Sequence, residues 1–582
     1  MFLLPRDRTQ HHLAAALART RIRPNAYDLA AVGLLLATAV LMAHGAAQMQ
    51  GSLAMLSSHP VSLDTARLPE YALRTTLRML IAMLASLFFT FVVATLAAKS
   101  RRAELVIVPA LDILQSVPVL GFLAFTVTFF MGLFPGRQLG AECASIFAIF
   151  TSQAWNMAFS FYQSLRTVPA DLDEVSRGFG FSAWQRFWRL EAPFATPGLV
   201  WNMMMSMSAG WFFVVASEAI TVGSMTVELP GIGSYLALAI TRRDFAAVGW
   251  AVATMALVIV LYDQLLFRPI VAWADKFRFE QTAAQDQPRS WVYGLVRRTR
   301  LMKRTLVPLL WIWQRLMLVR LGRRAPRPMA DAPRARWIDH LWLASVLAIA
   351  AWGAWITFDY ARQTLALADL YAAFGGGLAT LLRVVVLIAA ASAIWVPIGV
   401  WIGLRPGVAQ RVQPLAQFLA AFPANVLFPV AVVAIVATRA NPNLWLSPLM
   451  ILGTQWYILF NVIAGASAFP TDLREAAAVY RLRSWTWWRR VILPGIFPYY
   501  ITGALTASGG SWNASIVAEV AQWGNTRIEA YGLGAYIAKA TVAGDFHRVV
   551  LGVAVMALIV TVFNRVLWRP LYVFAERRMR LD

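Results

Sequence analysis

Among the charged side chains inside the long apolar stretches of this 582-residue sequence, four recur as two matching pairs. They are Arg78, Glu218, Arg383 and Glu519. At about 1.5 Å of rise per helical residue, all four fall near one depth, towards the outer ends of their helices. Charges inside a membrane are costly and usually face a path or each other. The arginines therefore either attract an anion into a path whose outer gate the glutamates shape, or pair with the glutamates and lock the helices together.

Two tryptophans lie two helical turns further in, on nearly the same helical face as the glutamates. Trp211 precedes Glu218 by seven residues, and Trp512 precedes Glu519 by seven. Their indole rings either line a path or pack between the helices of a bundle. The sequence leaves both alternatives open.

The sequence offers too few suitable residues for metal binding, disulfide formation or ATP binding. Asp545 and His547 could bind a metal ion, but two ligands are too few for a zinc site, so we assign none. The single cysteine, Cys143, permits neither an intrachain disulfide nor a cysteine-based metal cluster. No lysine follows a glycine, so the phosphate loop of ATP-binding proteins is absent. The lysines are Lys99, Lys276, Lys303 and Lys539. We expect no catalytic residue and no cofactor in this chain.

The composition excludes a water-soluble globular protein. Hydrophobic residues make up 59% of the chain and charged residues 14%, against about 25% charged in soluble domains. Apolar segments long enough to cross a hydrocarbon core of about 30 Å recur along the chain. They are 27–46, 71–98, 107–134, 141–165, 197–222, 245–274, 337–357, 373–404, 411–437, 443–466, 497–522 and 546–575. We predict an all-α membrane protein with roughly twelve transmembrane helices.

The net charge of +23 is concentrated in alternate loops. Arginines and lysines crowd the amino end, the 99–102 loop, the 297–324 stretch and the carboxyl end, whereas the other loops hold scattered single charges. The positive-inside rule then places both termini in the cytoplasm. The first apolar segment lacks a cleavage pattern, so we expect it to be retained. Anionic headgroups account for the excess charge without nucleic acid.

The chain contains an internal duplication. From Trp155 onwards the first half matches the second at a constant offset of 301, and further upstream the offset is 305. The matched positions include Trp155 with Trp456, Glu174 with Glu475, Trp211 with Trp512, Glu218 with Glu519, and Arg78 with Arg383. Six spans in each copy give a parallel repeat about an axis along the membrane normal, where a translocation path would run.

Three domains follow from the duplication. Residues 1–278 form the first six-span unit, 279–336 a basic connector, and 337–582 the second unit. In the connector, the segment from Trp291 to Leu321 mixes basic and apolar residues. It is either an amphipathic segment on the cytoplasmic leaflet or a linker without fixed structure. Pro308 argues against one straight helix there.

A polar segment follows the fourth span of each half. Acids after Pro169 predict a short helix, Gly180 a turn, and Ser182 the cap of a second short helix. Pro193 and Pro494 are expected to restart the membrane span. Each copy therefore predicts a helix-turn-helix outside the bilayer.

This segment resembles the signature of the permease subunits of ATP-binding-cassette importers. The family pattern is Glu-Ala-Ala, three residues, Gly, nine residues, Ile, one residue, and Leu-Pro. The second half follows it at Glu475 and Pro494, and the first at Glu174, Gly180 and Pro193. Two departures suggest that the halves couple unequally: Val175 and Ser176 replace the alanines in the first copy, and Arg481 replaces the glycine in the second.

Within the importers, the chain resembles the permeases for nitrate, sulfonates and taurine. The resemblance rests on residues 380–383, 413–417 and 532–534. It implies a fused permease that moves a small anionic solute inward by alternating access across a bacterial inner membrane. In that family, residues of about 171–191 and 472–492 would be the coupling helices that dock on an ATPase.

The resemblance also implies the partners. ATP and magnesium would bind two copies of a separate cytoplasmic ATPase, and a periplasmic or lipid-anchored binding protein would deliver the solute. Two alternatives stay open: a secondary transporter driven by an ion gradient, and a fused permease for iron or thiamine. The repeated acids lie in a cytoplasmic loop instead of at mid-membrane, which weighs against the secondary transporter.

Overall fold

The computed structural model describes residues 25–49, 51–52, 60–116, 119–222, 225–277, 290–299, 301–321, 336–467, 469 and 471–578. The terminal segments and the remainder of the connector lie outside these described residues. The described chain is built from helices and two small hairpins, so the prediction of an all-α membrane protein is confirmed.

Each predicted span coincides with one helix or with two consecutive helices. In the first half the helices are α2 (Ala26–Gln48), α4 (Leu68–Lys99), α5 (Arg101–Ser116), α6 (Leu123–Leu133), α7 (Leu139–Arg166), α10 (Ala192–Glu218), α12 (Phe245–Tyr262) and α13 (Arg268–Ala274). In the second half they are α16 (Arg336–Arg362), α17 (Leu367–Gly403), α18 (Pro406–Ala421), α19 (Phe428–Thr438), α20 (Pro442–Trp445), α21 (Gln455–Ser467), α24 (Leu493–Ala518), α26 (Phe546–Phe563) and α27 (Arg569–Arg578).

The third span of each half is broken into two helices. A short 3-10 helix, η2 (Val119–Phe122) or η6 (Ala424–Leu427), separates α5 from α6 and α18 from α19. Pro423 precedes η6 and has no backbone N–H to continue α18. The fourth span differs between the halves: α7 is a single helix, whereas the second copy bends by 44° before α21.

A hairpin and a short helix join the fifth and sixth spans of each half. The hairpins are β1 (Ala219–Val222) with β2 (Met225–Glu228), and β3 (Val520–Trp523) with β4 (Thr526–Glu529). The short helices are α11 (Ile232–Thr241) and α25 (Leu533–Ala543). With 10 and 11 residues they reach only about 15–17 Å, too short to cross a bilayer. These hairpins and short helices were not predicted from the sequence.

The chain divides into two compact units that cut across the two halves. Unit 1 comprises Met1–His44, Gln163–Trp201 and Leu261–Arg334, and unit 2 comprises Gly45–Tyr162, Asn202–Val260 and Ala335–Asp582. Unit 2 therefore contains spans from both halves. Its core mixes them: Met205 of the first half packs with Ile402, Leu459 and Phe460 of the second.

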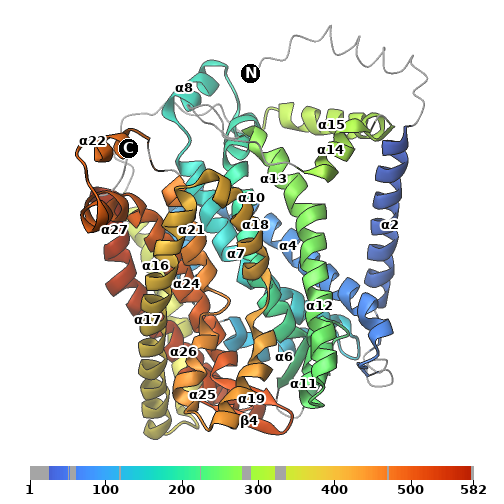
Figure 1. The fold of residues 1–582 in the computed structure, drawn as a ribbon, viewed down its shortest axis with the longest axis vertical. Coiled ribbons are helices and arrows are strands. Elements are labelled where there is room, and N and C mark those ends of the chain that lie inside the picture. The colour runs from blue at the N-terminus through green and yellow to red at the C-terminus, as the bar shows by residue number, and fades with distance from the viewer. Residues whose placement is uncertain are drawn as a thin grey trace. The chain divides into compact units, whose positions relative to one another are not determined.

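The two ends of unit 2 carry different structures. The hairpin strand β4 and the short helix α25 lie at one end, and α22 (Thr471–Val479) lies at the opposite end (Figure 1). Most of the sites described next lie in this unit, whereas the polar segment of the first half, residues 170–191, belongs to unit 1.

Candidate functional site

Arg78 lies at the centre of a buried ionic cluster in the first half. Its side chain on α4 is 0% exposed. It donates two hydrogen bonds to Glu142 on α7, from Nε to Oε2 at 2.6 Å and from Nη2 to Oε1 at 2.8 Å. It donates a third from Nη1 to Oε1 of Glu218 at 2.6 Å. One arginine thus joins α4, α7 and the end of α10, and the fork geometry fixes their register.

Glu218 also holds the short helix α11. Its Oε1 accepts a hydrogen bond from the Thr75 hydroxyl at 2.7 Å, and its Oε2 accepts one from the backbone N–H of Gly233 at 2.6 Å. The same hydroxyl of Thr75 accepts from the N–H of Ile232 at 3.0 Å. A carboxylate at the start of a helix satisfies N–H groups that have no partner within the helix. Glu218 therefore connects the ionic cluster to α11.

The second half repeats this arrangement around Glu519. Arg383 donates from Nη1 to Oε1 of Glu519 at 2.9 Å, and the Thr380 hydroxyl donates to the same oxygen at 2.7 Å. Oε2 accepts from the backbone N–H of Ala535 at 3.1 Å, at the start of α25. The structure thus brings Arg78 together with Glu218, and Arg383 together with Glu519.

The two clusters differ by one acid. In the second half the place of Glu142 beside the arginine is taken by Asn443, whose Oδ1 accepts from Nη2 of Arg383 at 3.3 Å. The first cluster therefore carries two carboxylates for one arginine, and the second carries one. The side chain of Arg383 is 13% exposed, whereas that of Arg78 is fully buried. Glu142 was missed in the sequence because only repeated charges were considered.

Glycines immediately before α11 and α25 make room for these carboxylates. A Cβ at Gly231 would overlap the carboxyl group of Glu218, and a Cβ at Gly532 would overlap that of Glu519. Both glycines have an extended backbone, with φ of −178° and −174°. Space for the carboxylate, and not backbone strain, accounts for glycine at these two positions.

Both predicted tryptophans are buried in the bundle. Trp211 and Trp512 are each 1% exposed. The indole N–H of Trp512 has no hydrogen-bond partner among the described residues. Neither tryptophan is among the residues that line the cavity described next.

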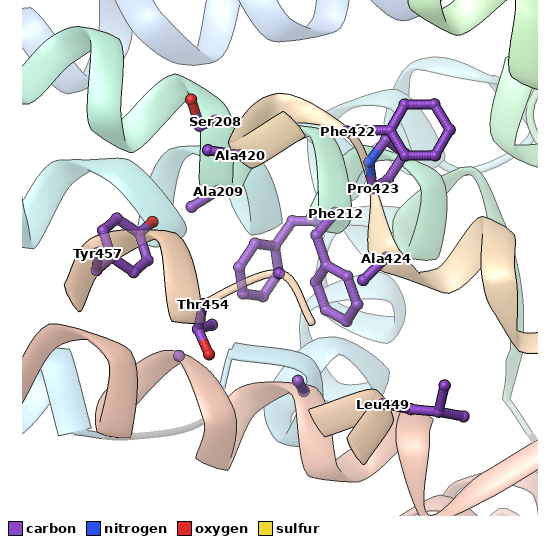
Figure 2. A pocket seen from close by; sticks show the side chains of 14 residues that line it. Ser208, Ala209, Phe212, Ala420, Phe422, Pro423, Ala424, Leu449, Thr454 and Tyr457 are labelled. Atoms are coloured by element: carbon purple, nitrogen blue, oxygen red, sulfur yellow. The ribbon is translucent and has the colours of Figure 1, made fainter. Parts of the chain in front are cut away.

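A cavity lies inside unit 2, between elements of the two halves. Its lining comes from α10 of the first half and from α18, η6, α21, α24 and the turn before α21 of the second (Figure 2). Phe212 lies between Tyr457 and Thr454 on one side and Pro423 and Ala424 on the other (Figure 2). The polar side chains that line the cavity are those of Ser208, Thr454 and Tyr457, and no charged residue is among the lining residues.

The fifth span of each half reaches the broken third span of the other. Asn513 on α24 accepts a hydrogen bond through Oδ1 from the backbone N–H of Val119 at 2.6 Å, at the start of η2. The residue that matches Asn513 in the first half is Phe212, which lines the cavity beside Ala424 at the start of η6. The break at η2 is thus fixed by a hydrogen bond to the side-chain amide of Asn513. The break at η6 instead adjoins the ring of Phe212 and the cavity.

The polar segment of the first half folds largely as predicted. The helix α8 (Ala170–Gly178) begins after Pro169, and Gly180 takes a left-handed φ of +64°. Ser182 caps α9 (Ala183–Arg186) through a capping box with Gln185. We refer to residues 170–191 as the first coupling segment.

Ion pairs bind the two helices of the first coupling segment together. Asp173 accepts from Arg177 at 2.6 Å and from Arg186 at 2.8 Å, and Arg186 also donates to Glu191 at 2.8 Å. Glu174 is exposed on the surface of α8. Asp173 therefore stabilises the segment internally, while Glu174 is presented outward.

The second coupling segment, residues 471–492, has the same turn without these ion pairs. It consists of α22, α23 (Ser484–Trp487) and η8 (Trp488–Ile492). Arg481 occupies the position of Gly180 with a left-handed φ of +50°, a conformation that costs about 1–2 kcal/mol for a residue with a Cβ. Trp487 and Ile492 stand where the first segment has Arg186 and Glu191. Glu475 is exposed, as Glu174 is.

The prediction that Pro193 and Pro494 restart the membrane span is wrong. The helix is continuous from Ala183 to Glu218 in the first half and from Ser484 to Ala518 in the second. One π-helical turn, Phe187–Glu191 or Trp488–Ile492, directly precedes each proline-containing turn. The wider turn changes the hydrogen-bond register where proline lacks an N–H, so the helix continues past it.

Comparison with known families gives a match in each half. The model described as "Binding-protein-dependent transport system inner membrane component" matches residues 86–268 and again residues 395–580, together more than half of the chain. The chain belongs to this family. It carries two inner membrane component domains in one polypeptide, in agreement with the duplication found in the sequence.

Several relatives of this family member are permease proteins. The chain is 32% identical over 149 residues to a bicarbonate transport system permease protein of Synechococcus elongatus, covering 25% of this chain and 51% of that protein. It is 26% identical over 186 residues to a nitrate import permease protein of Leptolyngbya laminosa, covering 32% and 63%. A glycine betaine/carnitine transport permease protein of Listeria monocytogenes is 31% identical over 165 residues, covering 28% and 52%. The chain thus spans about half the length of the curated relatives it matches.

Proposed function

We propose that this chain alone forms the whole transmembrane pathway of an ATP-driven importer. The observation that carries the proposal is the cavity in unit 2, whose walls come from both halves of one duplicated chain. A path on the axis between two related halves needs both of them. Here one polypeptide supplies both, so no second permease subunit is required.

We propose a small anion as the solute, of the nitrate, bicarbonate or sulfonate class. Two relatives are named for nitrate and bicarbonate. The hydroxyl of Tyr457 can donate a hydrogen bond to an anion in the cavity. The hydroxyl of Ser208 donates to the carbonyl of Met204 and that of Thr454 bonds to Ser511, so these two are already engaged. A path must hold its solute weakly enough to release it, and neutral donors do so better than an arginine.

A betaine-like solute is the second candidate. Three of the residues that line the cavity beside Tyr457 are phenylalanines, Phe212, Phe213 and Phe422. Aromatic faces attract quaternary ammonium groups, and one relative is named for glycine betaine and carnitine. This alternative assigns the main contacts to the rings instead of the hydroxyls.

In this proposal the ionic clusters are structural. Both guanidinium groups already bond to carboxylates, and neither is among the residues that line the cavity. The clusters then hold α11 and α25 against the outer ends of the spans. Trp211 and Trp512 pack the bundle behind them.

The two coupling segments are proposed to dock on two copies of a cytoplasmic ATPase that binds ATP and magnesium. An exposed acid on a short helix, Glu174 or Glu475, offers a partner a charge at a fixed position. A binding protein on the outer face would deliver the solute. Both termini would lie in the cytoplasm and the chain in a bacterial inner membrane.

Uptake by proteoliposomes that contain the chain and its co-purified ATPase tests the solute assignment. We expect ATP-dependent uptake of a small anion, reduced about two- to tenfold by Tyr457→Phe, which removes one hydrogen-bond donor. Tyr499→Phe is the matched control, because Tyr499 does not line the cavity. Betaine uptake that is lost in Phe212→Leu but retained in Tyr457→Phe would favour the second candidate. Uptake driven by an ion gradient without ATP would contradict both.

A further inference from the structure

The described residues of the connector form two helices, α14 (Trp291–Arg298) and α15 (Leu301–Leu318). The chain leaves the helical conformation at Thr299, and Pro308 lies within α15. The described part of the connector is therefore not a single straight helix, but the break is not at the proline.

Contacts within unit 1 fix α14 beside the ends of two spans. The side-chain amide of Asn25, just before α2, donates to the carbonyl of Arg298 at 3.0 Å, and the Arg298 guanidinium lies 5.6 Å from the ring of Tyr27. At the other side, the ammonium of Lys276, just after α13, lies 5.1 Å from the ring of Tyr293. The charge distribution assigns both span ends to the cytoplasmic side. The connector therefore lies at the level of the cytoplasmic membrane surface.

The surface of α15 suits an anionic bilayer. In unit 1, α15 runs across the direction of α2 (Figure 1). Ile312, Leu316 and Val319 follow a helical i, i+4, i+7 spacing and are 50%, 50% and 42% exposed. Residues 290–321 include seven arginines or lysines and no aspartate or glutamate. An exposed apolar ridge in a segment whose own charges are all positive is the pattern of a helix that lies in the interface of an anionic leaflet.

The same helix, α15, also contacts the first coupling segment. Nε1 of Trp184 donates to the carbonyl of Leu316 at 2.8 Å, and the side-chain amide of Gln185 donates to the carbonyl of Leu318 at 2.8 Å. The rings of Trp188 and Trp313 meet edge to face with centroids 5.0 Å apart. α9 and the π-helical turn after it are thus attached to α15.

The second coupling segment differs at the matching positions. Trp485, the counterpart of Trp184, is 67% exposed. Thr486 and Arg489 stand where the first segment has Gln185 and Trp188. The side chains that attach the first coupling segment to α15 are therefore replaced by other types in the second, apart from the tryptophan.

We propose that α15 lies in the anionic cytoplasmic leaflet and that lipid charge, through α15, sets the position of the first coupling segment. The membrane-binding step stands independently, whereas the effect on ATP hydrolysis rests on the proposed function. Anionic lipid would hold the connector on the membrane and so fix α9. Neutral lipid would release it and leave the second segment unaffected.

Spin-label depth measurements test the membrane-binding step. In a Cys143→Ser background, Ile312→Cys carries the label, and Val479→Cys on α22 is the matched control, at a position that is also apolar and exposed. The full chain is placed in nanodiscs of phosphatidylcholine, with or without about one-third phosphatidylglycerol. When phosphatidylglycerol is present, we expect the label at 312 to become less accessible to a water-soluble nickel reagent and more accessible to oxygen. The accessibility of the control label should stay unchanged. Equal water access in both lipids, or shielding from both reagents in detergent as well, would overturn the proposal.

Removal of the charges tests the cause. The double variant Arg315→Gln and Arg320→Gln should weaken the lipid-dependent shift by about fivefold for each residue, since one basic residue near an anionic surface contributes about that factor. With the co-purified ATPase, hydrolysis by the unsubstituted chain should depend on phosphatidylglycerol, and the double variant should lose that dependence while retaining its rate in phosphatidylcholine. A depth shift without any lipid dependence of ATP hydrolysis would overturn the proposal that lipid charge sets the position of the first coupling segment. Absence of hydrolysis in every lipid would instead contradict the proposed function and leave the depth result valid.

Discussion

Replacing Arg78 with methionine is expected to remove most of the folded protein from the membrane. The substitution leaves Glu142 and Glu218 buried at 0% exposure without the cation that both of them contact. Breaking a buried ion pair from one side costs about 3–5 kcal/mol. That is a large fraction of the stability of a typical domain. Fluorescence-detected size exclusion and thermal denaturation in detergent measure the loss.

Two further variants separate structure from transport. Arg383→Met should cost less, because Arg383 is partly exposed and faces one carboxylate and one amide. Adding Glu142→Gln and Glu218→Gln to Arg78→Met should restore much of the lost stability, since the buried negative charges are then removed. If Arg78→Met is as stable as the unsubstituted chain but fails in anion uptake, the arginine serves the solute and the structural assignment is wrong.

Glu475→Lys is expected to abolish the coupling between ATP hydrolysis and uptake. The substitution reverses an exposed charge on the second coupling segment, where Ala478, Trp487 and Ile492 replace the ion-pairing residues of the first segment. Loss of a charge pair at a protein interface costs about 2–5 kcal/mol. The measurement is the ratio of ATP hydrolysed to solute moved in proteoliposomes.

Glu475→Gln provides the conservative comparison. It retains the shape and hydrogen-bonding capacity of the side chain without the charge, so an intermediate ratio is expected. Glu174→Lys should be the milder of the two reversals, because the first coupling segment is also positioned by Asp173 and by α15. Coupling at the unsubstituted ratio in Glu475→Lys would contradict the docking assignment for this segment.

The sequence predicted the spans and the duplication because both leave regular patterns. Apolar segments of sufficient length mark helices in lipid, and a constant offset of 301 identifies matching positions without any structural information. The turn at Gly180 and the cap at Ser182 were also predictable, since both depend on local backbone preferences.

The remainder depends on tertiary contacts that leave no pattern in one sequence. Asn443 takes the place of Glu142 beside the arginine in the other half, so the repeated charges gave no reason to select Glu142. The attachment of Trp184 to the carbonyl of Leu316 joins residues 132 apart through a backbone atom, which any residue type would supply. Pro193 was misinterpreted because a proline usually begins or ends a helix, and the preceding π-helical turn is not visible in the sequence.

The stoichiometry of the assembled complex tests the central claim most directly. The chain would be purified in nanodiscs with its ATPase, and the mass of the intact complex measured by native mass spectrometry. A complete pathway in one polypeptide predicts a single 64.5 kDa chain bound to two ATPase subunits, with hydrolysis stimulated by a solute-loaded binding protein. Two copies of the chain in each complex, or an active transporter without any ATPase, would contradict it.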